Sequence, residues 1–202
     1  DLVEEVGRIY GYDNLKSTQP LLAETHGGYS EKETAMRRIK DIVQGQGMME
    51  AISYSLTSPE KAISFTKDPK PVVEVQWPLN SSRSTMRENL LTGLVDAASY
   101  NMARKQKELA LFEQGRVYDH ENNTFNEHEH LAALYSGHTV SANWQHLDQK
   151  IDFYFVKGQL TNLFRAIGIK DTDIEYRPEI IVGMHPTRTA GIYLNDQYVG
   201  LI

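Results

Sequence analysis

Residues 84–118 constrain the fold most, because they predict a helix that leads directly into a buried strand. In the first part of this segment, apolar residues recur every third or fourth position, which is typical of one face of an amphipathic helix. This apolar stripe consists of Met86, Leu90, Leu91, Leu94, Val95, Ala98 and Met102. Residues 109–118 then have the composition of a strand. A helix with one apolar face has to be packed, so the sequence indicates a domain that combines helices with a sheet.

Capping residues and glycines indicate where the other helices begin and end. Ser30 is followed three residues later by Glu33, which is the pattern of a capping box at a helix start. Asp152 is expected to cap a second long helix that closes at Gly168. Helices are therefore predicted over residues 2–10, 30–45, 84–107 and 152–168, with a short one after Ser58-Pro59.

Alternating and β-branched segments predict the strands, and polar segments predict the turns between them. Strands are expected over residues 50–56, 72–77, 109–118, 130–136, 173–177, 189–194 and 197–202. A polar hairpin tip is expected at residues 119–126, a loop that holds Trp144 at residues 141–149, and a tight hairpin at Asn195-Asp196. Strands that follow one another through hairpins, with separate long helices, predict an α+β fold with an antiparallel sheet flanked by helices on one side.

The chain divides into three parts. Residues 1–15 form an appended helical segment, residues 16–28 form a linker with Pro20 and the Gly27-Gly28 pair, and residues 29–202 form the main domain. The chain opens at Asp1 without a methionine and stops at Ile202 within an alternating pattern. We therefore expect the domain to be truncated at both ends.

Composition excludes several classes of protein. There is no cysteine, so disulfides and thiolate zinc sites are excluded. No apolar run is long enough to span a membrane, and we expect a cytoplasmic protein. The net charge of −6 argues against a broad nucleic-acid-binding face, because phosphate contacts dominate such binding. Any RNA partner would have to contact a local basic patch or bind elsewhere.

Three segments, in the same order along the chain, resemble one known family. They are Asp1-Leu-Val-Glu-Glu-Val-Gly-Arg-Ile-Tyr-Gly-Tyr-Asp-Asn-Leu, then Ser84-Thr-Met-Arg-Glu-Asn-Leu-Leu with Leu109-Ala-Leu-Phe-Glu-Gln-Gly-Arg-Val-Tyr, and finally Gly183-Met-His-Pro-Thr-Arg-Thr-Ala-Gly-Ile. The family is that of the bacterial phenylalanyl-tRNA synthetase beta subunit. The first segment is similar to the end of its small domain and the others to its catalytic-like module. The sequence departs from the family pattern at Gly7, Glu88, Asn89, Thr92, Thr187 and Thr189, which affects the expected loop geometry.

The resemblance implies a class II aminoacyl-tRNA synthetase-like fold and a role in phenylalanine–tRNA ligase, which joins phenylalanine to its tRNA using ATP. It implies a non-catalytic core module that scaffolds and docks the catalytic alpha subunit within an alpha2beta2 heterotetramer. ATP would be bound by the alpha subunit, and tRNA would be bound through the whole enzyme. Two alternatives remain open: a catalytically active ATP-dependent ligase domain, and a stand-alone module that binds RNA or protein.

No catalytic residue is predicted in this chain. A class II active site needs an arginine on the ATP α-phosphate and acidic groups for magnesium. The sequence Phe112-Glu-Gln-Gly-Arg stands where an Arg-x-Glu signature would be expected and lacks its spacing. The contact with the alpha subunit is instead assigned to exposed parts of the central helix face. The residues assigned to it are Met86, Arg87, Leu90 and Asn101.

Asp1, Glu4 and Glu5 are the candidate metal ligands. Their spacing puts three carboxylates on one helical surface, where they are able to gather around magnesium. Spacing alone favours the alternative, in which acids in a first helical turn face water and complement the helix dipole. The resemblance favours magnesium, because matching positions in the family are associated with an ion shared with the alpha subunit. A further acidic ligand lies upstream in the family and is absent here, so magnesium binding by this chain alone should be weak or absent.

Three other features have a functional and a structural interpretation. His120, His128, His130, His138 and His146 lie close together in the sequence, yet solvated histidines explain them better than a zinc site. Gly27-Gly28 is interpreted as a flexible linker instead of a phosphate loop. Arg104, Lys105 and Lys107 are suited to an RNA backbone, but a solvated helix end with cations at its negative pole explains them equally well.

Overall fold

The computed structural model describes residues 1–22, 26–140, 144–145 and 148–202. The helices are α1 (Leu2–Tyr10), α2 (Glu31–Gly45), α3 (Pro59–Ala62), α4 (Leu91–Met102) and α5 (Phe153–Ala166), with short 3-10 helices η1 (Tyr12–Asn14), η2 (Ser81–Arg83) and η3 (Asp171–Asp173). The strands are β1 (Met49–Glu50), β2 (Leu56–Thr57), β3 (Thr85–Met86), β4 (Leu109–Glu121), β5 (Thr124–Ser136), β6 (His138–Val140), β7 (Gln149–Lys150), β8 (Ile174–Pro178), β9 (Ala190–Leu194) and β10 (Gln197–Leu201). This content confirms the predicted α+β class.

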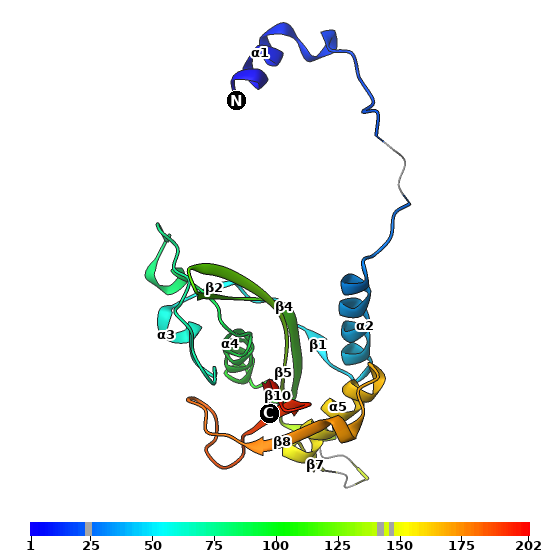
Figure 1. Ribbon diagram of the computed structural model, residues 1–202, viewed down its shortest axis with the longest axis vertical. Coiled ribbons are helices and arrows are strands. Elements are labelled where there is room, and N and C mark those ends of the chain that lie inside the picture. Colours follow the sequence, from blue (N-terminus) through cyan, green and yellow to red (C-terminus); the bar gives the residue numbers. More distant parts are fainter. Residues whose placement is uncertain (23–25, 141–143, 146–147) are drawn as a thin grey trace.

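The long β4–β5 hairpin is the framework of the main domain (Figure 1). Its strands pair antiparallel along their whole length, from Leu109 opposite Ser136 to Glu121 opposite Thr124. The turn lies at Asn122 and Asn123, which both have positive φ angles, so the predicted tip is correct in place but shorter than expected. Strand β1 pairs with β4 in parallel.

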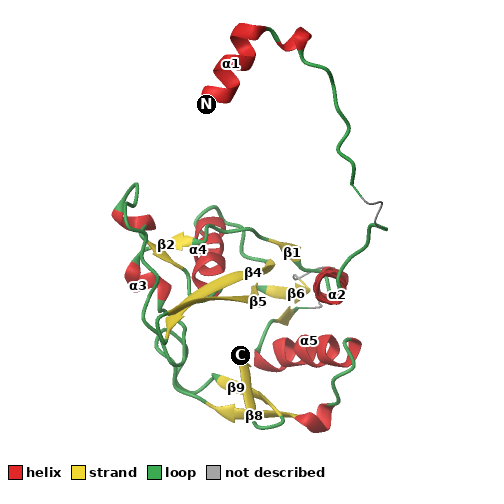
Figure 2. Cartoon of the chain, turned by 45° about the horizontal axis from the view of Figure 1, so that its top comes forward, coloured by secondary structure: helices red, strands yellow, loops and turns green. Residues whose placement is uncertain are grey.

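The prediction of one antiparallel sheet is only partly correct. Among the described residues, the strands form the sheets β1-β4-β5, β10-β9-β8, β2-β3 and β6-β7. Figure 2 shows the paired strands β8 and β9 apart from the β4–β5 hairpin, with α5 beside them. The predicted strand over residues 50–56 is split between β1 and β2, and the predicted strand over residues 72–77 is reduced to one bridge between Glu74 and Thr85.

The central helix begins later than predicted. Residues 85–86 form strand β3, which pairs with β2, and α4 starts only at Leu91. The reason is Asn89, whose side-chain Oδ1 accepts hydrogen bonds from the backbone N–H groups of Leu91 and Thr92 at 2.9 and 3.3 Å. An asparagine that satisfies the first free N–H groups of a helix fixes its start.

Helices cover both faces of the β4–β5 hairpin, which corrects the prediction of helices on one side. On one face, Phe112 packs with Val43 of α2 and Leu163 of α5. On the other face, Leu109 and Leu111 pack with Leu94 and Ala98 of α4. Alternate residues of β4 thus point to opposite cores. The domain is a layered structure with the hairpin in the middle (Figure 1).

Several sequence predictions are confirmed. Ser30 and Glu33 form the capping box of α2, with the Ser30 backbone N–H donating to the Glu33 carboxylate at 2.8 Å. The Asp152 carboxylate accepts from the Phe155 N–H at 2.8 Å at the start of α5. Asn195 and Asp196 form the tight turn between β9 and β10. The predicted loop at residues 141–149 falls mostly outside the described residues, as does His146.

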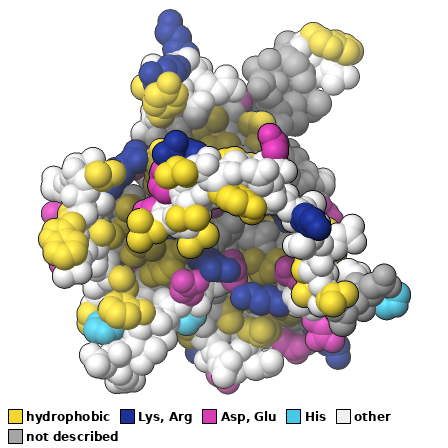
Figure 3. Space-filling model, turned by 90° about the horizontal axis from the view of Figure 1, so that it is seen from above, with side chains coloured by type: hydrophobic (Ala, Val, Ile, Leu, Met, Phe, Trp, Pro, Cys, Tyr) yellow, Lys and Arg dark blue, Asp and Glu magenta, His cyan; other side chains and the backbone are white. Residues whose placement is uncertain are grey.

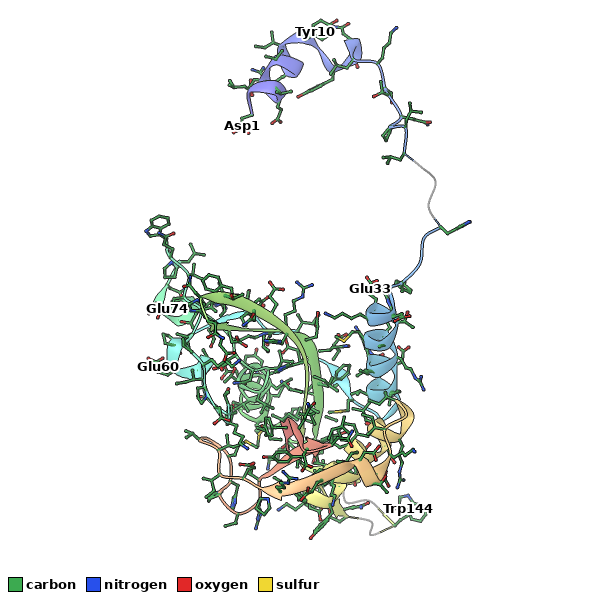
Figure 4. The ribbon with its side chains drawn as sticks, in the orientation of Figure 1. Asp1, Tyr10, Glu33, Glu60, Glu74 and Trp144 are labelled. Atoms are coloured by element: carbon green, nitrogen blue, oxygen red, sulfur yellow. The ribbon has the colours of Figure 1, made fainter. Side chains whose placement is uncertain are left out.

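The first helix lies apart from the main domain. Figure 4 shows Asp1 and Tyr10 at the two ends of α1, away from Glu33 on α2. Residues 15–22 and 26–30 lie between them without helix or strand and are exposed, and the predicted linker also includes residues 23–25, which are not among the described ones. No helix in the part of the chain that the structure describes is long and apolar enough to cross a membrane.

Candidate functional site

A buried ion pair links the segment that precedes α4 to the central β4–β5 hairpin. Arg87 and Glu113 are 6% and 2% exposed, and the Arg87 Nη1 lies 2.6 Å from the Glu113 Oε1. The backbone holds Arg87 in place, because its N–H donates to the Ser55 carbonyl and its carbonyl accepts from the Tyr118 N–H, both at 2.9 Å. The guanidinium also donates from Nε to the Arg116 carbonyl at 2.9 Å.

Ser53 completes this buried network. Its backbone N–H and hydroxyl donate to the two Glu113 carboxylate oxygens at 3.2 and 2.6 Å, and its Oγ accepts from Arg87 Nη1 at 2.9 Å. The network needs glycines beside it: a Cβ at Gly93 would lie 2.2 Å from Ser53 Oγ, and one at Gly115 would lie 2.6 Å from Arg87 Nη2. Sequence reasoning missed Ser53 and Glu113. The detectable signal was Glu113, an acid inside an otherwise apolar strand that had to have a partner.

A cleft of about 370 Å³ opens next to this network. The charged side chains on its rim already have partners. Lys61 Nζ lies 2.6 Å from the Asp96 carboxylate, and the Arg83 guanidinium lies 3.6 Å from the centre of the exposed Tyr54 ring. Hydroxyl groups contribute much of the remaining polar lining, from Ser53, Thr57, Ser58, Ser82 and Thr92. The cleft is therefore a mixed surface and lacks an unpaired buried charge.

The end of the β4–β5 hairpin next to its turn carries an acidic cluster. Asp119 accepts from the Asn126 amide at 2.8 Å, lies 3.0 Å from His128 Nε2 and lies 3.7 Å from Lys70 Nζ. Burial acts to raise the pKa of Asp119, but the Asn126 hydrogen bond and the charges of Lys70 and His128 outweigh it and hold the pKa below its usual value. Lys70 also contacts Glu121 at 2.5 Å.

Glu88 lies beside this cluster. Its Oε1 accepts from the Lys70 backbone N–H at 2.8 Å, while its Oε2 is buried without a hydrogen-bond partner. Burial raises the pKa of Glu88 above its usual value, and the nearby Asp119 charge adds to that effect. This end of the hairpin is thus negative, and its nearest cation, Lys70, is already used by carboxylates.

On the opposite face of the hairpin, the cation is likewise already paired with carboxylates. Arg116 is the only cationic residue in β4 and β5, and its Nη1 and Nε lie 2.9 and 3.2 Å from the carboxylates of Glu127 and Glu129. These contacts raise the pKa of Arg116, chiefly through the Glu129 hydrogen bond. The hairpin therefore holds no unpaired Lys or Arg.

The structure separates the four residues assigned to a subunit interface. Leu90 is 1% exposed and Arg87 takes part in the buried network, so the premise that they lie on an exposed helical face is wrong. Met86 belongs to β3 and Asn101 to α4, and both are half-buried. The Asn101 amide donates to the Ala97 carbonyl at 2.8 Å. The physical reason is the late start of α4, which turns residues 86–90 into the domain.

The three predicted metal ligands lie at the start of α1, with Asp1 just before the helix, but they do not gather. The Glu5 carboxylate pairs with Arg8 at 2.7 Å, and the Asp1 side chain makes no capping hydrogen bond. Within the described residues, Asp, Glu and His side chains nowhere form a group of three that is able to hold an ion. The carboxylates of this chain do not by themselves fit a complete magnesium site, and magnesium binding by Asp1, Glu4 and Glu5 stays a prediction.

Apolar side chains are exposed both on the edge strand β1, at Met49, and on the segment after it, at Ile52 and Tyr54. Strand β1 lies at the edge of its sheet, so its outer side has no paired strand among the described ones. Met49, Ile52 and Tyr54 are 63%, 88% and 69% exposed. An unpaired edge with exposed apolar side chains is typical of a surface that another chain covers. Figure 3, which looks onto the α1 end of the molecule, shows that hydrophobic side chains are also exposed on that face.

The sequence is similar to one family and to several of its members. Residues 15–202 match the family model described as the phenylalanyl tRNA synthetase beta chain CLM domain. Over all 202 residues, the chain is 94% identical to the phenylalanine–tRNA ligase beta subunit of Lactobacillus johnsonii and 78% identical to that of Lactobacillus acidophilus. It is 39% identical over 207 aligned residues to the same subunit of Streptococcus pyogenes serotype M1. The chain spans 25% of the length of the two Lactobacillus subunits and 26% of the Streptococcus subunit.

Solved structures confirm the fold predicted from the sequence. Pyrrolysyl-tRNA synthetase from Desulfitobacterium hafniense matches 82% of this chain and 56% of its own chain, with a TM-score of 0.54 and 15% identity. An ATP phosphoribosyltransferase regulatory subunit/histidyl-tRNA synthetase from Bacillus halodurans matches 80% of this chain and 42% of its own, with a TM-score of 0.54 and 13% identity. The fold is that of class II aminoacyl-tRNA synthetase-like domains.

Proposed function

Because this chain belongs to the phenylalanyl-tRNA synthetase beta chain family, through its CLM domain, we propose that it is a non-catalytic core module of phenylalanine–tRNA ligase. In this role the module has the fold of a class II catalytic domain and docks the catalytic alpha subunit. The alpha subunit binds ATP and carries out aminoacylation, and the two subunits assemble as an alpha2beta2 heterotetramer. tRNA binds through the whole enzyme.

The observation that carries the non-catalytic role is the charge of the central hairpin. Attack on the α-phosphate of ATP needs a free cation at the position where negative charge develops. In this chain, Arg116 is held by two glutamates and Arg87 is buried against Glu113. The remaining charges on the hairpin are carboxylates, at Asp119, Glu121, Glu127 and Glu129 among others. A triphosphate would be repelled by this surface.

The exposed segment after β1 supports the docking role. Stable interfaces have an apolar centre with aromatic residues, and such patches are seldom left exposed on single chains. Ile52 and Tyr54 fit this description, and the half-buried Ser53 between them is anchored on Glu113. The anchor holds the backbone between the two exposed side chains, which lowers the backbone entropy lost on binding. We assign this segment to the alpha subunit, with Met86 and Asn101 as neighbouring candidates.

The test is complex formation between the full-length beta subunit and its alpha subunit, measured in magnesium by light scattering on a sizing column. We expect a stable mixed complex for the natural sequence. Ile52→Glu should weaken the complex by at least about tenfold, because a buried interface centre does not tolerate an unpaired charge. The matched control is Ile180→Glu, since Ile180 is 84% exposed on another loop and its substitution should leave the complex intact.

The outcomes separate the proposals. Absence of a complex between folded natural subunits would refute docking. Equal weakening by Ile52→Glu and Ile180→Glu would show that the effect is not specific to the segment after β1. The active-ligase alternative predicts ATP–pyrophosphate exchange by this chain alone with phenylalanine and magnesium, and measurable exchange would overturn the non-catalytic role.

A further inference from the structure

A short basic turn follows α4. Three of the four residues at positions 104–107 are cationic: Arg104, Lys105 and Lys107. All three are exposed. Nine of the nineteen lysines and arginines at positions 29–202 are paired with carboxylates, whereas the side chains of Lys105 and Lys107 have no ion-pair or hydrogen-bond partner among the described residues. In a chain with a net charge of −6, this turn is a local concentration of unpaired positive charge.

Lys105 has a backbone conformation that favours glycine. Its φ angle is +69°, and the turn closes α4 with hydrogen bonds from the Gln106 N–H to the Asn101 carbonyl at 3.1 Å and from the Lys105 N–H to the Met102 carbonyl at 3.0 Å. Glycine is the usual residue at this position of a helix end, because a Cβ is strained there. Within the described residues, the lysine side chain makes no ion pair or hydrogen bond that would offset that strain. Such residues are found preferentially at functional sites.

The surroundings fix the turn in place. The Arg104 guanidinium donates to the Tyr100 carbonyl at 3.0 Å and stacks 3.4 Å from the centre of the exposed Tyr100 ring. Gly137 approaches from the β5–β6 connection so closely that a Cβ there would lie 2.8 Å from the Lys107 carbonyl oxygen. The nearest acid in the sequence, Glu108, lies 3.9 Å from His138. The backbone that carries the two lysines is therefore held by its contacts with α4 and with Gly137.

We propose that the basic turn, with Lys105 and Lys107 as its contacts, binds the phosphate backbone of the tRNA on which the ligase acts. This inference rests on the proposed function, which brings tRNA to the assembled enzyme. Two lysine ammonium groups a few residues apart suit successive phosphates, and phosphate contacts need no base recognition. Arg104 covers one face of the Tyr100 ring, and the part of the ring that stays exposed offers a surface on which an unpaired base is able to stack.

The alternative is that the cations only complement the negative end of α4. That interpretation explains Arg104, which contacts a helix carbonyl, but it does not require lysine at position 105, where glycine would close the helix with less strain. The two interpretations therefore differ on one substitution. With Lys105→Gly, a helix-end role predicts unchanged tRNA affinity, whereas a phosphate contact predicts weaker binding together with a thermal midpoint that does not fall.

The experiment uses the complex of full-length beta subunit with alpha subunit and a phenylalanine tRNA labelled with a fluorophore. Binding is measured by anisotropy at several salt concentrations for Lys105→Gly, for Lys107→Gln and for the double variant. The matched control is Lys16→Gln with Lys170→Gln, which removes two exposed lysines that lie on other elements. We expect each lysine of the turn to contribute roughly fivefold to affinity at 0.1 M salt and about 0.9 to the slope of log K against log salt.

Unchanged affinity in the double variant, or a loss equal to that of the control, would overturn the proposal. Weaker binding with an unchanged salt slope would also overturn it, because a lost phosphate contact must release fewer counterions. Complex formation by light scattering is recorded in parallel. If the variant subunits assemble and the tRNA affinity does not change, only the tRNA contact is wrong. If the folded natural subunits do not assemble, the proposed function itself fails.

Discussion

Glu113 shows how a single charge is accommodated in the core of this domain. It lies in β4 among apolar neighbours and is 2% exposed, and its two carboxylate oxygens are satisfied by Arg87 and Ser53. A buried ion pair of this kind adds little net stability, but removing one partner leaves the other charge buried and unpaired.

Glu113→Ala is therefore expected to lower the free energy of unfolding by about 3–5 kcal/mol. The measurement is urea unfolding of the 202-residue chain, followed by circular dichroism. The control is the double variant Arg87→Met with Glu113→Leu, which removes both charges and should regain much of the loss. A loss below about 1 kcal/mol for Glu113→Ala would show that water reaches the pair.

The partners of individual buried side chains were also the features that the sequence predicted least well. Glu113 in an apolar strand indicates that a buried cation must exist, but the pattern does not identify it. Arg87 is only 26 positions away in the sequence, yet it was assigned to an exposed helix face, because residues 84–90 fit the helical period as well as α4 does. Ser53 gave no signal, since its role depends on which strand lies beside β4.

Helix ends were predicted better than strands, because a helix start is encoded by residues a few positions apart. Ser30 and Glu33 satisfy each other's backbone groups within one turn, and the pattern is visible in the sequence. The start of α4 was missed because Asn89 performs the same task inside a segment whose apolar residues follow the helical period on both sides of it. The strands at residues 50–56 and 72–77 were overestimated, since alternation does not reveal whether a partner strand is available.

Ser30→Ala tests how much the capping box stabilises α2. The substitution removes the hydroxyl that accepts from the Glu33 N–H at 3.2 Å, and the expected loss is about 1 kcal/mol in the free energy of unfolding. α2 supplies Val43 to the core, so fraying at its start should be seen in the urea midpoint of the whole domain. Ser99→Ala on the exposed side of α4 is the matched control and should change stability by less than about 0.5 kcal/mol. Equal effects of the two substitutions would contradict the role of the capping box.

At the scale of the whole molecule, the fold class and the family were predicted from the sequence, while the layering was not. Helices on both faces of the hairpin follow from the opposite orientations of Phe112 and Leu111 on β4. A continuous apolar run such as residues 109–112 is consistent with that arrangement, but it does not show which helix covers which face. The segment after β1 that we propose for docking was also missed, since its exposure depends on β1 being an edge strand.

The division of the chain at its linker leads to the last prediction. α1 and η1 contain no buried residue, and the described residues between η1 and α2 are exposed. Deleting residues 1–28 should therefore leave the free energy of unfolding of the main domain unchanged within about 0.5 kcal/mol. A helix as short as α1 is marginal alone in water, so it contributes little to the unfolding transition.

The measurement compares urea unfolding of residues 29–202 with that of the full chain, using the same spectroscopic signal for both. Leu94→Ala serves as the reference for a change that the assay must detect. Leu94 is 0% exposed, and its truncation should cost about 2–5 kcal/mol. If the deletion costs more than about 1 kcal/mol while Leu94→Ala behaves as expected, α1 packs on the main domain in solution, and the boundary at residues 16–28 is wrong. If the deletion is neutral, the exposed apolar face of α1, including Val6 and Ile9, is free for contacts beyond the main domain.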